Sequence, residues 1–295
     1  MSTQLSLVDD VKGIIRDTAF SYEDILAYLN EGQKKIAGGI LIQYPDRTQV
    51  RSSPLPDLST TDALTSSTSN VYISMPSDYD RDLYFLTSET TELRIIVLSS
   101  MGELLDYYPA LDNTGQVRFA AIRGTRLYYQ GMPSSAESLT AYYFRTPYDM
   151  ENYAAATISF TASTSTITDS ASGFSTFYAG QTIDITGTSN NNGTYTIAAV
   201  ASGGASFTVD ESLTNESAGS KFTIRSRPDG IPVHLHEDLL VNFAAKKVFE
   251  RKSISDPQKM GDAQRATAFF NQAMLNLEAS IERVAEPIQF TSEAY

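Results

Sequence analysis

The pattern of apolar and polar residues predicts two helices near the start of the chain. After Ser21, apolar residues recur at the spacing of one helical face, at Tyr22, Ile25, Leu26, Leu29 and Ile36. Ser21 with Asp24 forms a weak capping box, and Gly38 and Gly39 supply a stop. A shorter helix is predicted from Ser6, and the tight connection between the two predicts an antiparallel hairpin. Its apolar residues are Leu7, Val8, Val11, Ile14 and Ile15.

Two further amphipathic helices are predicted in the last quarter of the chain. One follows Pro232; the other starts at Asp256 and Pro257 and stops before Pro287. Unbroken, the second would be about 45 Å long at about 1.5 Å per residue. Because a lone apolar stripe must be covered, we expect residues 1–43 and 230–287 to form one helical bundle. The stripes are Leu240, Phe243, Ala244 and Val248, and Ala263, Ala266, Phe270, Ala273, Leu277, Ile281 and Val284.

Between these two ends of the chain, apolar residues no longer recur at helical spacing, and apolar and polar residues alternate instead. Residues 44–70 are rich in Pro, Ser, Thr and Asp, which predicts a long surface loop with room for one short extended stretch. Residues 71–148 contain strand-like runs separated by turn residues, which predicts an antiparallel β meander with one short helix at MGELLDYY. The loop and the β region are expected to occupy residues 44–154. The strand-like runs are VYISM, LRIIVLS, QVRFAAI, TRLYYQ and LTAYYF.

Residues 155–226 are rich in Thr, Ser, Gly and Asn and contain a series of short strand-like runs. We expect this segment to be an inserted small all-β domain, Ig-like or another sandwich. Residues 288–295, IQFTSEAY, are apolar and aromatic with no core of their own, so they are expected to form a C-terminal tail. The expected fold class is α+β: a helical bundle from both ends of the chain, an antiparallel meander in the middle and the inserted domain.

Composition narrows the possible functions. The chain has 295 residues, of which 41% are hydrophobic, enough to bury a sizeable core. It contains no cysteine, which removes disulfides, thiolate metal sites and cysteine nucleophiles. No apolar run is long enough to cross a bilayer and the start lacks a secretion signal, so we expect cytosolic synthesis and no membrane association. A net charge of −13 argues against a nucleic-acid-binding surface.

Candidate chemistry is sparse. His234 and His236 form a possible metal pair, but no further ligands follow at a recognisable spacing, so capping or surface roles are favoured. Residues 78–89 resemble a calcium loop in their acidic positions, yet Leu83 stands where the sharp turn requires glycine, which favours a solvated turn. Phosphate-binding, nucleophile-elbow and zinc-protease motifs are all missing. We therefore expect no enzymatic activity, no metal and no cofactor.

Residues 108–148 contain a spaced set of aromatic, glycine and proline positions: Tyr108-Pro109, Gly115, Phe119-Ala120-x-Ile122, Gly124, Leu127, Pro133 and Tyr142-Tyr143-x-Arg145-x-Pro147. With these positions, the segment resembles the central segment of head-to-tail adaptor (connector) proteins of tailed bacteriophages, especially short-tailed ones. The helix after Ser21, with Leu29, Asn30 and Glu31 at its centre, is similar to the family's opening helices, and residues 232–252 resemble the start of its closing helical pair. The resemblance leaves out residues 44–70 and 155–226, and the latter separately resemble small β modules of phage virion proteins.

The resemblance implies a structural virion protein at the head–tail junction, assembled in the cytoplasm of the bacterial host. Its expected form is a homo-oligomeric ring, typically of twelve copies, under the portal protein. The ring would extend the channel through which genomic DNA passes without specific binding, and it would provide a platform for tail or nozzle proteins. Because the family's C-terminal tail commonly reaches into the portal, the expected portal contacts are Ile288, Phe290 and Tyr295.

Two other classes remain open from the sequence. One is a tail or receptor-facing virion protein whose inserted β module binds a glycan, although the long repeats of trimeric fibres are missing. The other is a glycan-cleaving enzyme, which would need two carboxylates converging in a cleft. No such acid pair can be singled out from the sequence.

Overall fold

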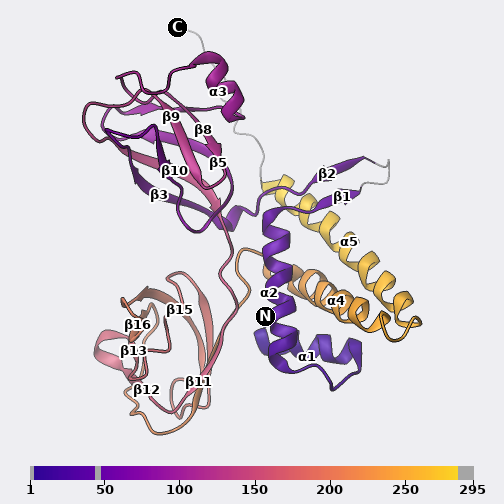
Figure 1. Cartoon of the computed structure of the whole chain (residues 1–295). Helices are drawn as coiled ribbons and strands as arrows, with labels where there is room; N and C mark the ends of the chain where they lie inside the picture. Colours follow the sequence, from indigo (N-terminus) through magenta and orange to yellow (C-terminus); the bar gives the residue numbers. More distant parts are fainter. Residues whose placement is uncertain (1–2, 44–47, 285–295) are drawn as a thin grey trace. The chain divides into compact units, whose positions relative to one another are not determined.

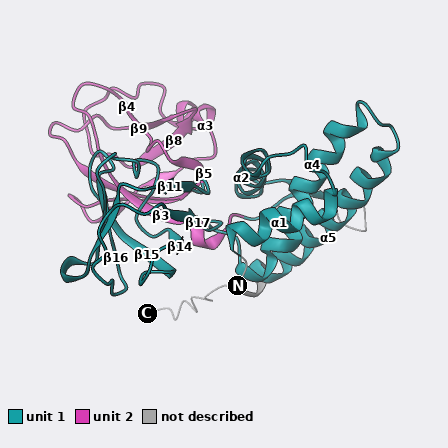
Figure 2. Ribbon diagram, turned by 90° about the horizontal axis from the view of Figure 1, so that it is seen from below, with its two compact units in different colours: residues 1–53, 147–295 teal, residues 54–146 magenta. Residues whose placement is uncertain are grey.

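The computed structural model describes residues 3–43 and 48–284 and divides the chain into two compact units (Figures 1 and 2). Unit 1 consists of Met1–Ser53 and Pro147–Tyr295, and unit 2 consists of Pro54–Thr146. Unit 1 is therefore built from both ends of the chain, whereas unit 2 is one continuous segment between them.

The fold class expected from the sequence is wrong. The described residues are mostly β-sheet, in sheets of two, four, four and seven strands, with five α-helices. The expected combination of a terminal helical bundle with one antiparallel meander is not formed. Alternation of apolar and polar residues assigns the two faces of a strand, but it does not decide which strands pair. The strands therefore combine in an order that the pattern alone could not predict.

Four helices belong to unit 1: α1 (Gln4–Ile15), α2 (Tyr22–Gly38), α4 (Asn242–Ser253) and α5 (Lys259–Val284). Helix α4 contacts the other three (Figure 1). The capping box of Ser21 and Asp24 is confirmed, because each side chain accepts a hydrogen bond from the other's backbone amide. The predicted start of α1 is wrong: Thr3 is the N-cap, and Ser6 completes a second capping box.

The segment between Pro232 and α4 is less regular than its apolar pattern predicts. It forms a 3-10 turn at Val233–Leu235 and then a π-helical turn at Glu237–Val241, which continues into α4. Leu239 and Leu240 are fully buried in this turn. The wider π turn carries Glu237 and Asp238 on its exposed side, next to α1.

Residues 48–70 contain two strands, more than the one short extended stretch expected within a surface loop. In unit 1, β1 (Leu41–Gln43) pairs with β2 (Gln49–Arg51) as an antiparallel hairpin. A 3-10 turn at Pro56–Leu58 then leads into β3 (Ser59–Thr65), a strand of unit 2. Strand β3 is mostly exposed, with only Leu64 buried, and β10 supplies the partner that the local sequence does not reveal.

Unit 1 also contains one seven-stranded sheet, in the part of the chain where the sequence predicts an inserted small all-β domain. Its strand order is β11-β17-β14-β15-β16-β13-β12. The two outermost strands, β11 and β12, follow each other in the chain with only residues 156–157 between them, so the sheet curls around a core of its own. The strands are β11 (Asn152–Ala155), β12 (Ile158–Thr161), β13 (Thr166–Asp169), β14 (Thr182–Thr186), β15 (Gly193–Val200), β16 (Ser206–Val209) and β17 (Phe222–Ser226).

Unit 2 contains two four-stranded sheets and helix α3 (Met101–Tyr107), the short helix predicted at MGELLDYY. The sheet orders are β3-β10-β5-β6 and β4-β9-β8-β7. The pairing of β7 with β8 is parallel, which a simple meander excludes. The remaining strands are β4 (Tyr72–Ser74), β5 (Tyr79–Ser88), β6 (Leu93–Arg94), β7 (Ile96–Val97), β8 (Phe119–Arg123), β9 (Arg126–Gln130) and β10 (Ser138–Arg145).

Candidate functional site

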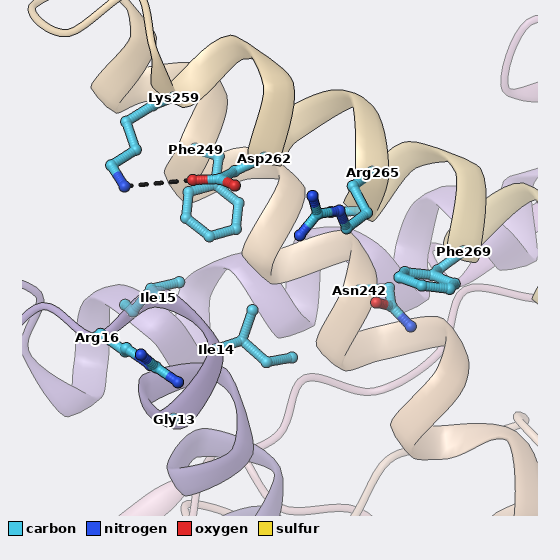
Figure 3. Close-up of a pocket in the computed structure, with 11 residues that line it drawn as sticks. Gly13, Ile14, Ile15, Arg16, Asn242, Phe249, Lys259, Asp262, Arg265 and Phe269 are labelled. Carbon is cyan, nitrogen blue, oxygen red and sulfur yellow. Dashed lines mark hydrogen bonds and ion pairs between the residues drawn. The ribbon is translucent and has the colours of Figure 1, made fainter.

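Helices α1, α4 and α5 of unit 1 border an open groove of about 640 Å³ (Figure 3). Ile15 and Phe249 form its apolar floor, with 4% and 6% of their surfaces exposed. At the rim, Ile14 is 46% exposed and Phe269 is 58% exposed. The sequence pattern placed Ile14 on the buried face of α1 together with Ile15, and this is wrong. The groove thus presents two apolar side chains to solvent beside a buried floor.

Two guanidinium groups complete the groove. Arg16 ends α1 in a left-handed conformation with φ of 48°, and Arg265 projects from the exposed side of α5 (Figure 3). Neither arginine forms an ion pair with another described residue. The third cation, Lys259, is 3.2 Å from the carboxylate of Asp262 on the same helix. Arg16 and Arg265 therefore give the groove a net positive charge.

Other basic side chains near the helices are already paired. Lys247 on α4 is 2.8 Å from Glu31 on α2, and Lys252 is 2.5 Å from Asp17 in the connection between α1 and α2. A hydrogen bond from Lys252 lowers the pKa of the Asp17 carboxyl group, and hydrogen bonds from Lys247 and Lys35 lower that of Glu31. These ion pairs link elements within unit 1. Lys247 and Lys252 are therefore less available than Arg16 and Arg265 to bind a group on another molecule.

A second groove, of about 370 Å³, adjoins the first and has the opposite charge. Its charged lining is Asp9 and Asp10 of α1 with Glu237 and Asp238 of the π-helical turn, all four exposed. None of these carboxylates forms an ion pair within residues 3–43 and 48–284. Both grooves are lined by Gly13, Ile14 and Asn242. A basic and an acidic surface therefore meet at Ile14.

The expected portal-contact residues Ile288, Phe290 and Tyr295 lie outside the described residues. The two histidines do not converge on one site: His234 is exposed, whereas His236 is 2% exposed and its Nε2 lies 2.7 Å from the carbonyl oxygen of Ile231. Within the described ranges, no cluster of three or more His, Cys, Asp or Glu residues is arranged to hold a metal ion.

The segment that resembles a calcium loop begins with a turn at Ser77 and Asp78, after Met75-Pro76 as favoured from the sequence, and continues as a strand. Strand β5 runs from Tyr79 to Ser88, and the acidic positions follow its alternation. Glu89, just after the strand, accepts hydrogen bonds from Ser138 and Thr140 of the paired strand β10. The hydrogen bonds from Thr140 and Ser138 hold the carboxylate at the end of β5 and lower its pKa.

Sequence reasoning missed the groove because its walls come from three separate helices. The available signal was weak: Arg265 and Phe269 are four residues apart on α5, outside the apolar stripe. In the described part of the chain, no helix has the length and hydropathy needed to span a bilayer. Comparison with protein-family models and with curated proteins finds no match to this sequence.

Proposed function

We propose that this protein is a structural head-to-tail adaptor of a tailed bacteriophage virion. In this role, copies form a ring, of about twelve, under the portal protein. The ring extends the DNA channel and provides the docking platform for tail or nozzle proteins. The observation that carries the proposal is the resemblance of residues 108–148 to the central segment of such adaptors.

The placement of the matching residues supports a structural role. Ala120 and Leu127 are fully buried, and Tyr143 is 1% exposed in the core of unit 2. Gly124 has a φ of 62° in the turn between β8 and β9, where a side chain would be strained. The motif therefore specifies the packing and turns of a scaffold, as expected of an assembly component.

Exposed apolar side chains in unit 1 also support assembly. Ile14 and Phe269 stand at the rim of the groove, and Ile254 and Met260, near the connection between α4 and α5, are 87% and 48% exposed. Ile14 and Phe269 line the same groove, and apolar side chains gathered at a surface commonly mark a contact with another protein. An acidic chain is also suited to a channel that DNA must pass without sticking.

The deciding experiment is to mix the protein with its cognate portal and to image the product by electron microscopy. A ring of about a dozen copies on the portal is expected. A trimer that does not bind the portal would instead favour the receptor-facing class with a glycan-binding module. Turnover of a polysaccharide by the purified protein would favour a glycan-cleaving enzyme and contradict the proposal.

The C-terminal tail provides a narrower test of the same function. We expect a variant that ends at Pro287 to keep its circular dichroism spectrum but to lose portal binding in a pull-down assay, because Ile288, Phe290 and Tyr295 are removed. A matched control replaces Thr291 and Ser292 by alanine and should bind the portal like the native chain. Unaltered binding by the shortened chain would show that the portal is held elsewhere.

A further inference from the structure

We propose that the free protein pairs with a second copy of itself through the two adjoining grooves, with a two-fold axis near Ile14. In this pair, the basic groove of each copy faces the acidic groove of the other. The pairing goes beyond the proposed function, because it concerns the chain before it meets any portal, and it holds whether or not a ring forms later.

Charge complementarity identifies a second copy as the occupant. The whole chain carries a net charge of −13, so two copies repel each other over most of their surfaces. The basic groove reverses that sign locally, since Arg16 and Arg265 have no ion-pair partner among the described residues. The adjoining groove supplies matching carboxylates, also unpaired in the described chain, from Asp9, Asp10, Glu237 and Asp238. One chain therefore contains both halves of a complementary contact.

The shared wall of the grooves determines the symmetry. Because Gly13, Ile14 and Asn242 line both grooves, the two charged surfaces lie on the same side of unit 1. A head-to-tail contact joins different surfaces of neighbouring copies, and a closed ring places them on well-separated sides of each subunit. A two-fold contact instead joins one surface to itself. Because the two grooves adjoin, a single two-fold contact engages both grooves of each copy and closes at two copies.

Apolar side chains add contact area at the centre of the pair. Ile14 lies where the grooves meet, and Phe269 stands at the far rim of the basic groove (Figure 3). Burying such side chains against a partner removes apolar surface from water, while the surrounding charges set orientation and specificity. The pair should therefore weaken both when salt screens the charges and when the apolar side chains are replaced.

The test reverses the charge of each groove in turn in the full-length protein. Self-association of the native chain and of each variant is then measured by sedimentation velocity, over a range of protein concentrations at low salt. We expect the native chain to form dimers. Replacing Arg16 and Arg265 by glutamate, or Asp9, Asp10 and Asp238 by lysine, should each weaken self-association about tenfold or more by opposing like charges. An equimolar mixture of the two variants should restore a one-to-one complex, because each variant then presents the charge that the other lacks.

Two controls address folding and the apolar centre. Each variant should keep the circular dichroism spectrum of the native chain. Ile14→Ser should weaken the dimer without changing any charge, whereas Ile254→Ser, at an exposed position outside both grooves, should leave it unchanged.

The pairing would be overturned if the native chain stayed monomeric at every concentration, or if the mixture of the two charge variants did not associate. It would also be overturned if the native chain formed assemblies larger than dimers and the variants formed the same assemblies equally well. None of these results bears on the adaptor function, which is decided by imaging the protein with the portal. A portal-bound ring together with a monomeric free chain would refute the pairing alone.

Discussion

His236 shows how burial changes a single residue. Its imidazole is 2% exposed at the start of the π-helical turn, and Nε2 lies 2.7 Å from the carbonyl oxygen of Ile231. Burial is the main cause that lowers the pKa of this imidazole below its usual value. His234, two residues earlier, is exposed. The same residue type therefore has two different environments within three positions.

The buried imidazole predicts a pH dependence of stability. Because the pKa of His236 is lower in the folded chain, the unfolded chain binds more protons once the pH falls below the ordinary value, about 6.5. The contribution of the neutral His236 imidazole to the stability of the folded chain is complete above that pH. It is lost as the pH falls through the pKa of His236 in the folded chain. Denaturant unfolding at pH 7.5 and 5.5 should show this loss. His236→Gln should reduce the difference, whereas His234→Gln should preserve it; an equal effect of both would contradict the assignment.

Gly32 limits how closely α2 can approach α4. A Cβ atom at this position would lie 2.9 Å from Cδ1 of Phe243, whose ring is buried against Phe270 at a centroid distance of 5.6 Å. Because the ring has little room to move, only glycine fits without a shift of one helix. The glycine therefore contributes to the packing of α2 on α4 although it weakens the helix itself.

We expect Gly32→Ala to destabilise the protein by about 1 kcal/mol, because overpacking by about 1–3 kcal/mol exceeds a gain in helix propensity of about 1 kcal/mol. Gly261→Ala is the matched control in α5, where an added Cβ meets nothing within 4 Å. The control should be neutral or slightly stabilising in chemical denaturation. A stabilising effect at Gly32 would mean that the helices separate easily.

At the scale of elements, α5 holds the segment that leaves the β1–β2 hairpin. The carboxylate of Glu278, 5% exposed, accepts hydrogen bonds from the backbone amide of Ser53 at 2.8 Å and from its hydroxyl at 2.7 Å. Ser53 is the last residue of the first segment of unit 1. Helix α5 thereby positions the point at which the chain leaves this unit.

Removing that carboxylate should have a measurable cost. We expect Glu278→Ala to lower the free energy of unfolding by about 1–3 kcal/mol, because the partly buried amide of Ser53 loses its acceptor. Asn271→Ala, at an exposed position of the same helix, should change it by less than about 0.5 kcal/mol. Equal effects in denaturant unfolding would mean that the Glu278 contact contributes nothing.

At the scale of the whole molecule, unit 2 is a continuous segment with a hydrophobic core of its own. Its two ends lie close together, because Ser59 near the start of the unit pairs with Phe144 near its end. A segment whose two ends are neighbours and whose hydrophobic core is its own can be separated from the rest of the chain without losing that core.

We therefore expect residues 54–146 to fold when produced alone. Cooperative thermal unfolding by circular dichroism and dispersed amide signals in nuclear magnetic resonance spectra would show this. As a control, a shorter segment that starts after β3, at residue 66, should unfold more readily, because β10 then loses one of its two partners. An unfolded isolated segment would mean that unit 1 is required to hold it together.

The sequence by itself determined where most helices lie and what starts them. The spacing of Ile25, Leu29 and Ile36 and the cap at Ser21 were sufficient for α2, because a helix is built from contacts three and four residues apart. Strand-forming character was also visible in the alternation of β8, β9 and β10. The fold class was wrong because strand partners, such as β3 for β10, are set by contacts far apart in the chain.

Only the tertiary structure decided the candidate site. Ile14 and Ile15 are neighbours with the same apolar character, yet the packing of α1 against α4 buries one and exposes the other. Arg16 and Arg265 are almost the length of the chain apart, and they line one groove because α1 and α5 both border α4. Local sequence specifies hydrogen bonds within an element, whereas a groove depends on which elements bury each other's apolar faces.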